Sequence, residues 1–311
     1  YYIFSPAGGV PTGWQEVLRS KSPWGPYEAR NVLEQGDTDI NGPHQGAWID
    51  TPDGKEDWFI HFQDKGPYGR VINLEPMKWL ENGWPVIGVD PDGDGRGVPV
   101  RTYKKPNVGK TYPRQTPQES DEFDSVELGK QWQWKDNPSA LWYYCDAAAS
   151  KLRLFSNALP ESAKSIYDLP NLLLQKFPAR NFTATAKVQF FPRKKDGKIM
   201  EGERAGIVVM GYNFGTLSLM SRNDGIYLVQ TECYKANKGG EESEVEAIKV
   251  DDGKEMYLRM RLDYTGPKVP KQKPDYTAEA TFYYSFDGKK FTKIGRPVKV
   301  DVGHWIGAKF G

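Results

Sequence analysis

Residues 47–62 read AWIDTPDGKEDWFIHF, and this stretch decides the fold class. Two runs rich in aromatic and apolar residues, 47–50 and 57–62, flank the turn signal TPDG at 51–54. Aromatic and β-branched side chains favour strands, and Asp-Gly favours a tight turn between them. The stretch therefore predicts two antiparallel strands joined by a hairpin.

Further short strands are expected on both sides of this hairpin. Runs of similar character occupy 1–5, 16–20 and 70–74, and Gly- and Pro-rich stretches separate them. Runs of four to six residues joined by tight turns are typical of an antiparallel meander, such as a propeller blade. No stretch in residues 1–100 has the period of an amphipathic helix.

The second half of the chain has longer strand patterns. Polar and apolar residues alternate through 182–190, 257–262 and 281–286, and Asp-Gly pairs at 224–225, 252–253 and 287–288 mark turns. Alternation with period two indicates sheets with one face in water. Many such strands in under 200 residues predict a two-sheet sandwich of jelly-roll type.

Residues 101–119 separate these two regions. The segment is basic, polar and rich in proline, so it cannot bury enough apolar surface to order itself. We therefore expect a first domain at 1–100, a linker at 101–119 and a second domain at 120–311.

The composition limits the function classes. Lys and Arg total 42 and Asp and Glu total 41, which gives a net charge of +1. A chain this close to neutral has no global field to attract nucleic acid or an anionic membrane, so neither partner is expected. No apolar run approaches the ~20 residues of a membrane-spanning helix. The aromatic content of 13%, with 32 Gly and 23 Pro, favours an all-β protein.

Cys145 and Cys233 are the only cysteines. Their wide separation fits no zinc motif, which needs closely spaced pairs. Either one disulfide or two separate buried thiols would be compatible with the sequence, and the second reading is slightly favoured.

Several motifs in the first half resemble glycoside hydrolase family 43. They are NGPHQGAW at 41–48, SKSPWGPYE at 20–28, GR at 69–70 and WLENGWPVIG at 79–88. In the second half, QWQW at 131–134, RAGIVV at 204–209 and WIGAK at 305–309 resemble the β-sandwich that many members of this family carry. The resemblance covers nearly the whole chain in the order of the family.

The resemblance implies an all-β protein with two parts. Residues 1–100 would form the last blades of a five-bladed β-propeller, and residues 120–311 a jelly-roll, concanavalin-like β-sandwich. The implied activity is inverting hydrolysis that removes xylosyl or arabinofuranosyl units from plant polysaccharides. The chemistry would need no cofactor, although a structural calcium ion is compatible with the family. The implied location is secreted or periplasmic.

The family's three catalytic carboxylates come from the first three blades, which would precede residue 1. Both ends of the chain read as interrupted strands, so we expect a piece of a longer protein. No catalytic residue is therefore expected in this chain, which alone should be inactive. Its expected partners are a polysaccharide and the N-terminal part of its own propeller.

Five residues are candidate substrate-binding residues. By resemblance, His44 lies at the channel axis beneath the sugar and helps to hold a calcium ion through water, with Gln45 beside it; the alternative is a hydrogen-bonded core histidine. Arg70 would place its guanidinium beside the substrate, unless it is a surface arginine. Trp14 and Gln15 could face a sugar ring, although a tryptophan in a strand is more often part of the core.

Asp90, Asp92 and Asp94 are candidate metal ligands. Their spacing is similar to the front half of a calcium-binding loop, but position twelve is Arg101 instead of Glu. A solvated turn is the favoured reading.

A rival hypothesis assigns no chemistry to the chain. The sandwich could instead be a carbohydrate-binding or packing module, with Trp132, Trp134 and Trp142 as a sugar platform or as core. A calcium ion near Asp121, Glu122 and Asp124 is a weaker possibility. An exposed row of aromatic residues would favour the binding module, and a buried row would favour packing.

Overall fold

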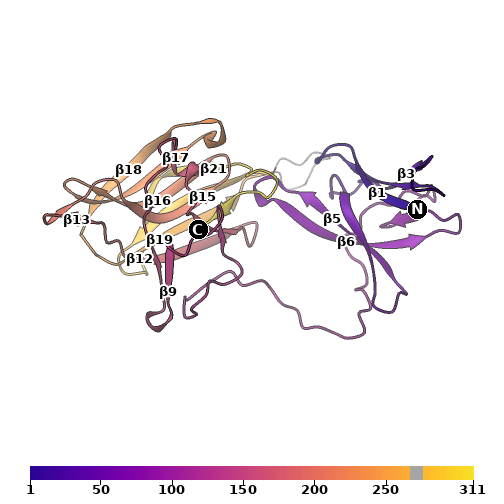
Figure 1. Cartoon of the computed structure of the whole chain (residues 1–311), viewed down its shortest axis with the longest axis horizontal. Helices are drawn as coiled ribbons and strands as arrows, with labels where there is room; N and C mark the ends of the chain where they lie inside the picture. The colour runs from indigo at the N-terminus through magenta and orange to yellow at the C-terminus, as the bar shows by residue number, and fades with distance from the viewer. Residues whose placement is uncertain (267–275) are drawn as a thin grey trace. The chain divides into compact units, whose positions relative to one another are not determined.

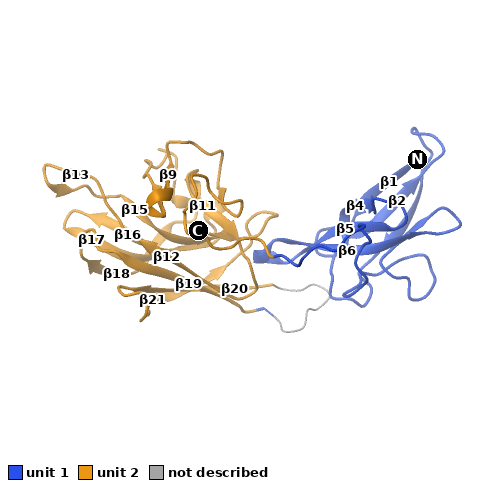
Figure 2. Ribbon diagram, turned by 90° about the horizontal axis from the view of Figure 1, so that it is seen from below, with its two compact units in different colours: residues 1–115, 266–275 blue, residues 116–265, 276–311 orange. Residues whose placement is uncertain are grey.

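The computed structural model describes residues 1–266 and 276–311, and it is built almost entirely of β-strands (Figure 1). The chain divides into two compact units (Figure 2). Unit 1 contains residues 1–115 and 266–275, and unit 2 contains residues 116–265 and 276–311. No helix among the described residues is long and apolar enough to cross a membrane.

Unit 1 consists of two antiparallel sheets. The first has the order β1–β2–β3, with β1 (Tyr2–Ala7), β2 (Trp14–Arg19) and β3 (Glu28–Leu33). The second has the order β4–β5–β6–β7, with β4 (His44–Asp50), β5 (Asp57–Asp64), β6 (Arg70–Trp79) and β7 (Pro85–Ile87). A short 3-10 turn, η1 (Gly66–Tyr68), connects β5 to β6.

The hairpin expected from residues 47–62 is confirmed as β4 and β5. Asp50 pairs with Asp57 and Ile49 with Trp58. In the turn, Gly54 adopts φ +66° and donates its N–H to Thr51 O at 2.8 Å. Only a residue without a Cβ adopts this left-handed conformation at no steric cost, so Gly54 fixes the turn.

An apolar core joins the two sheets of unit 1. Its members are Val17, Val32 and Leu33 from the first sheet, Phe59, Met77 and Ile87 from the second, and Trp84, which directly precedes β7. The guanidinium carbons of Arg19 and Arg30 lie 4.2 and 4.8 Å from the Trp84 ring centroid. The Trp84 ring is therefore held by cation–π contacts as well as by apolar packing.

A buried histidine–glutamate pair lies on the core face of the second sheet. The side chains of His61 and Glu75 are both fully buried, and His61 Nε2 lies 3.2 Å from Glu75 Oε1. Glu75 Oε2 accepts the Val100 N–H at 2.7 Å, while His61 Nδ1 lies 3.2 Å from Phe62 O. Both ring nitrogens thus lie within hydrogen-bond distance of oxygen atoms. The carboxylate thus ties Val100 to β5 and β6.

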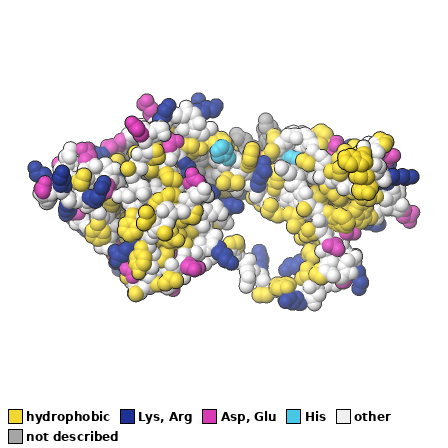
Figure 3. Space-filling view, viewed as in Figure 1, with side chains coloured by type: hydrophobic (Ala, Val, Ile, Leu, Met, Phe, Trp, Pro, Cys, Tyr) yellow, Lys and Arg dark blue, Asp and Glu magenta, His cyan; other side chains and the backbone are white. Residues whose placement is uncertain are grey.

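The opposite face of the second sheet leaves apolar side chains in solvent. Phe59 points into the core, so Ile60 and its partner Leu74 lie on the other face, together with Ile49 and Ile72. Ile72 is 65% exposed. Figure 3 shows hydrophobic side chains gathered over the visible face of unit 1. Exposed apolar faces of this kind mark surfaces that another structural element covers.

Unit 2 is a sandwich of two antiparallel sheets. The larger has the order β18–β17–β16–β15–β22–β11–β8, and the smaller β12–β19–β20–β21. Strands of the larger sheet are β8 (Gln133–Trp134), β11 (Leu173–Lys176), β15 (Arg204–Met210), β16 (Phe214–Arg222), β17 (Gly225–Cys233), β18 (Glu242–Val250) and β22 (Lys309–Phe310).

Strands of the smaller sheet are β12 (Phe182–Val188), β19 (Met256–Tyr264), β20 (Ala278–Ser285) and β21 (Thr292–Val300). Two small hairpins pair β9 (Tyr143–Asp146) with β10 (Lys151–Leu154) and β13 (Lys194–Lys195) with β14 (Lys198–Ile199). Short 3-10 turns are η2 (Ala147–Ala149), η3 (Ile166–Asp168) and η4 (Ala236–Lys238).

The two sheets of unit 2 approach closely. A Cβ built on Gly215 would lie 2.7 Å from Val298 Cγ2, so only glycine fits at this point of the interface. The other face of the larger sheet is also covered, because Ile166, Val208, Met210, Phe214 and Cys233 form a second apolar cluster there. Unit 2 therefore buries both faces of its larger sheet near β15 and β16.

Glu242 holds the start of η3, whose Ile166 belongs to this second cluster. Burial alone would raise the pKa of the Glu242 carboxyl, but hydrogen bonds and charge from Arg204, the Thr231 hydroxyl and the Ile166 N–H lower it below 4.5. Arg204 donates from both Nη atoms, at 2.5 and 2.9 Å. Thr231 Oγ1 donates at 2.6 Å and also contacts Thr216 Oγ1 at 2.7 Å.

Both cysteines are free and buried. Burial raises the pKa of both thiols. This agrees with the favoured reading of two separate buried thiols. Residues 101–119 contain no strand, and the first part of this segment lies against β5, where Tyr103 makes an edge-to-face contact with Trp58 and Lys104 binds Glu56 at 2.7 Å.

Replacing Glu75 by Ala should destabilise unit 1 by about 3–5 kcal/mol, because it leaves His61 buried without its partner. Denaturant unfolding followed by tryptophan fluorescence measures the loss. Glu28→Ala is the matched control, since it removes an ion pair with Arg19 whose carboxylate is 72% exposed. Equal midpoints for the two variants would show that the buried pair contributes nothing.

The stability of unit 2 should fall in acid through Glu242. Its folded-state pKa is lowered, so its stabilisation is present above the ordinary glutamate value of 4.5 and is lost as the pH falls below 4.5 through the folded-state pKa. Thermal unfolding of wild type and Glu242→Gln across this range tests the prediction. The difference between the two proteins should shrink toward low pH, and a constant difference would contradict it.

Candidate functional site

Four of the five predicted substrate-binding residues lie around the start of β4 and the N-terminal end of β2. His44 begins β4 and is 3% exposed, while Gln45 is exposed. His44 Nδ1 lies 2.7 Å from Gly42 O, and a carbonyl only accepts, so Nδ1 carries the proton. The described residues supply no hydrogen-bond partner for His44 Nε2, which is therefore a free acceptor for a hydroxyl group or water.

Phe62 connects His44 to Arg70, the fifth candidate. The ring centroids of His44 and Phe62 are 5.6 Å apart, and Arg70 Cζ lies 4.2 Å from the Phe62 centroid. Phe62 is itself 6% exposed and is paired with His44 across β4 and β5. The structure thus brings His44 and Arg70 together on one aromatic ring. Sequence reasoning missed Phe62, although it ends the aromatic run of the hairpin.

Gln15 links the two sheets at this point. It is fully buried, and its Nε2 donates to Ser5 O at 2.9 Å and Glu16 O at 3.0 Å. Its Oε1 accepts the Gln45 N–H at 3.0 Å. Gln45 adopts φ +59°, which is uncommon outside glycine, beside the irregularity in the β4–β5 pairing. The geometry supports Gln15 as the group that holds Gln45 in place rather than as a direct sugar ligand.

A second buried polar link supports the loop before His44. Gln63 Nε2 donates to Asn41 Oδ1 at 2.9 Å, and Asn41 Nδ2 donates to Pro11 O at 3.2 Å. A Cβ on Gly42 would lie 2.2 Å from Val10 O, and Gly42 has φ +56°. The loop at 10–13 therefore packs directly on residues 41–44. Sequence reasoning missed both residues as supports of the site, because Asn41 is only the first residue of the motif at 41–48 and Gln63 only one polar residue of β5.

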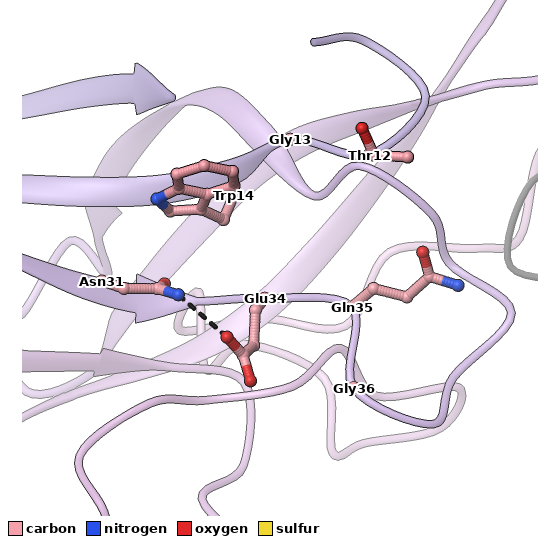
Figure 4. A pocket seen from close by; sticks show the side chains of 7 residues that line it. All are labelled: Thr12, Gly13, Trp14, Asn31, Glu34, Gln35 and Gly36. Atoms are coloured by element: carbon pink, nitrogen blue, oxygen red, sulfur yellow. Dashed lines mark hydrogen bonds between the residues drawn. The ribbon is translucent and has the colours of Figure 1, made fainter. Parts of the chain in front are cut away.

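Trp14 lines a pocket of about 500 Å³ in unit 1 (Figure 4). The walls come from residues 12–14, Asn31 and residues 34–36. Trp14 is half-buried, and its Nε1 donates to Glu16 Oε1 at 3.0 Å. The tryptophan of β2 thus faces a cavity instead of lying wholly in the core.

Asp90, Asp92 and Asp94 do come together. One carboxylate oxygen from each residue lies within 4.8 Å of one oxygen of each of the other two. Each also accepts hydrogen bonds inside the loop, for example from Gly93 N and Gly95 N to Asp90 at 2.8 and 2.9 Å. Arg96 donates to Asp94, and its side-chain hydrogen bond is the main reason the pKa of Asp94 is lowered. These bonds account for the loop conformation without an ion, and the calcium site stays a prediction.

The tryptophans of the sandwich are packed on other aromatic rings. Trp132, Trp134 and Trp142 are half-buried. Trp134 lies 5.3 Å from Trp142 and 5.3 Å from Tyr143, measured between ring centroids, and Phe123 stacks on Trp132 at 5.9 Å. Asp121 accepts the Trp132 Nε1–H at 2.8 Å. These contacts favour a packing role for the aromatic group over an open sugar platform.

Two family models match the chain in sequence order. Residues 1–85 match "Glycosyl hydrolases family 43", and residues 120–311 match "Beta xylosidase C-terminal Concanavalin A-like domain". Together with the sheets described above, these matches confirm the expected fold, part of a β-propeller followed by a concanavalin-like sandwich.

Known proteins resemble the chain over two thirds or more of its length. A "Putative beta-xylosidase" of Xylanibacter ruminicola is 37% identical over 314 residues, covering 100% of this chain and 52% of that protein. A "Non-reducing end alpha-L-arabinofuranosidase" of Bacteroides ovatus is 32% identical, covering 67% of this chain and 39% of that protein. A solved structure described as a bifunctional GH43-CE of Bacteroides eggerthii is 26% identical with a TM-score of 0.74, covering 100% of this chain and 36% of that one. Two curated relatives match nearly all of this chain, and the chain spans about half of their length.

The loop at 90–96 should keep its conformation without calcium. Because its carboxylates are already hydrogen-bonded to loop amides and to Arg96, chelation with EDTA should leave the unfolding midpoint of unit 1 unchanged. Addition of millimolar calcium should not raise it either. Differential scanning calorimetry measures both. A midpoint that rises with calcium in the wild type but not in Asp92→Asn would instead establish a structural ion here.

Proposed function

Because this chain belongs to family 43 of the glycosyl hydrolases, we propose that it is the C-terminal half of an enzyme that removes xylosyl or arabinofuranosyl units from plant polysaccharides. The observation that carries the proposal is the pair of family models, which match residues 1–85 and 120–311, the second through a domain described as the C-terminal domain of β-xylosidase. The grouping of His44 and Arg70 on Phe62 adds a polar site in the propeller part.

The proposed reaction is inverting hydrolysis. One carboxylic acid protonates the departing oxygen, and a carboxylate on the opposite side activates a water molecule. The two carboxyl groups stand about 6.5–9.5 Å apart, which leaves room for that water. In this chain the one buried carboxylate of residues 1–115 is Glu75, which is already committed to His61 and to Val100 N. The relatives are about twice as long as this chain. We therefore propose that the acid and the base come from an N-terminal half of the propeller.

Arg70 and His44 have binding roles in this proposal. The planar guanidinium of Arg70 presents several donors, which suits neighbouring sugar hydroxyls or a catalytic carboxylate. His44 Nε2 can accept from a hydroxyl group, because Nδ1 holds the proton. Phe62 keeps both groups in place. No cofactor takes part in the proposed chemistry, and a calcium ion would be structural.

The proposed partner of unit 1 is the rest of its own propeller. Ile49, Ile72 and Leu74 share one face of the second sheet and are 40%, 65% and 39% exposed. Burying such side chains is worth about 25 cal/mol per Å², so a neighbouring blade would bind there by apolar packing. Since a polysaccharide cannot enter a cell intact, we also propose a secreted or periplasmic location.

The chain should be inactive alone and active when joined to the N-terminal half. We expect the 311 residues to release no pentose from aryl β-xylosides or α-arabinofuranosides, whereas the full-length protein should release one of them. Proton NMR of the first-formed sugar reports whether the anomeric configuration inverts. Turnover by the pure chain, or a full-length protein inactive on both substrates, would contradict the proposal.

A matched pair of variants locates the substrate site in the full-length protein. Arg70→Lys keeps the charge but loses the planar fork, and misplacing a contact at the reacting sugar costs about 100-fold in kcat/KM. Arg30→Lys is the control, because Arg30 belongs to β3 of the first sheet and its guanidinium lies over Trp84. Equal losses would mean that Arg70 acts only through stability.

A further inference from the structure

The smaller sheet of unit 2 ends in a strand with a free edge. β12 pairs with β19 along all of its residues, and the described residues place no strand on its other side. In an antiparallel strand, alternate residues direct both their N–H and their C=O away from the paired neighbour. Within the described part of the chain, no backbone hydrogen bond outside the β12–β19 ladder reaches these groups. The edge of β12 is therefore open to pairing with another strand.

The other three edges of the sandwich are protected against such pairing. β8 has only two residues. β21 contains Gly295, which has φ +64°, and Pro297, and its pairing with β20 is irregular at this point. β18 carries four charged side chains, which are Glu242, Glu244, Glu246 and Lys249. Short strands, irregular pairing, proline and charge are the usual ways in which proteins protect edge strands.

β12 has little of this protection. Its sequence, FTATAKV, contains neither proline nor glycine, and Lys187 is its one charged residue. Lys187 Nζ lies 2.8 Å from Glu255 Oε1. The ion pair offsets the charge that would otherwise repel an approaching strand, so β12 is a long and almost uncharged edge.

The side of β12 that faces the larger sheet is incompletely covered. Its inward residues are only half-buried: Phe182, Ala184, Ala186 and Val188. Their cross-strand neighbours in β19 include Leu258 and Met260, which are 0% and 1% exposed. The apolar layer of the sandwich is thus closed at β19 and partly open at β12. A further strand beside β12 would remove this remaining apolar surface from water.

The edge of β12 is complementary to itself. When two copies pair antiparallel with Thr185 opposite its own counterpart, every residue of β12 faces a residue of the other copy. The remaining pairs are Phe182 with Val188, Thr183 with Lys187, and Ala184 with Ala186. No charge lies opposite a like charge, and apolar residues meet on the inward side. A two-fold axis at any other residue would leave part of the strand without a partner.

We propose that the edge of β12 binds a second copy of this chain, and that the two copies pair across a two-fold axis at Thr185. Such a contact is isologous, because both copies use the same surface, and it joins the two smaller sheets into one continuous antiparallel sheet. A contact between two seven-residue strands is smaller than a standard protein interface. We therefore expect a reversible dimer with a dissociation constant in the micromolar range.

Sedimentation of the 311-residue chain at increasing micromolar concentration tests this interface. Thr185→Lys should weaken the dimer about five- to tenfold, because the axis brings the two introduced ammonium groups opposite each other. Thr292→Lys is the matched control, since Thr292 is exposed on β21, the other edge strand of the same sheet. It should leave the dissociation constant unchanged. Thr185 Oγ1 accepts from Arg259 Nε at 2.9 Å, so thermal unfolding is measured for each variant.

A mixture of two variants separates the interface from a folding defect. Thr185→Glu alone should also weaken the dimer, because two carboxylates then meet at the axis. An equimolar mixture of Thr185→Lys and Thr185→Glu should dimerise again, because opposite charges then face each other. Mixing does not repair a misfolded subunit, so recovery would place position 185 opposite itself.

Three results would overturn the proposal. The first is a wild-type chain that stays monomeric throughout the micromolar range. The second is a dimer that Thr185→Lys leaves intact, and the third is a mixture of the two charge variants that does not dimerise. Association that Ile72→Asp abolishes and Thr185→Lys does not would belong to the open face of unit 1, and it is one form of the second result.

Discussion

The arrangement of the candidate site depends on one buried amide. Gln15 uses both Nε2 hydrogens on Ser5 and Glu16 and its Oε1 on the Gln45 N–H, so the first sheet fixes the backbone at the start of the second. His44 precedes that backbone directly, and Trp14 precedes Gln15. A buried amide without hydrogen-bond partners costs free energy of folding. Loss of the Gln15 link would therefore destabilise both the first sheet and the Gln45 backbone. His44, the Gln45 backbone and Trp14 therefore belong to one hydrogen-bonded framework.

The two units differ in how fully they bury their apolar surface. In unit 2 the larger sheet packs on the smaller one through Leu217, Phe282 and Val298, and Ile166 and Phe214 cover its other face. In unit 1 the part of the sheet face that carries Ile72 and Leu74 is open. The sandwich thus has the packing of an independent domain, whereas the propeller part gains stability from whatever closes its outer face.

Local patterns predicted the elements, and tertiary packing decided the site. The hairpin at 47–62 was readable because its turn and both strands lie within sixteen residues, and the same holds for the Asp-Gly turns of the sandwich. His44 and Arg70 were identified only through a family resemblance. The role of Phe62, the Gln15 link and the Trp14 pocket involve segments separated by tens of residues, and no periodicity encodes such contacts. Trp14 is an example, because its place in a strand favoured a core position, whereas the structure places it in the wall of a pocket.

The buried cysteines have a consequence for where the chain can work. Nucleophilic exchange and oxidation proceed through the thiolate, and the raised pKa of Cys145 and Cys233 keeps this form scarce at neutral pH. Neither sulfur is accessible to a bulky oxidant or a mixed disulfide. The strands of this fold therefore depend on no disulfide between Cys145 and Cys233 that a reducing environment could break.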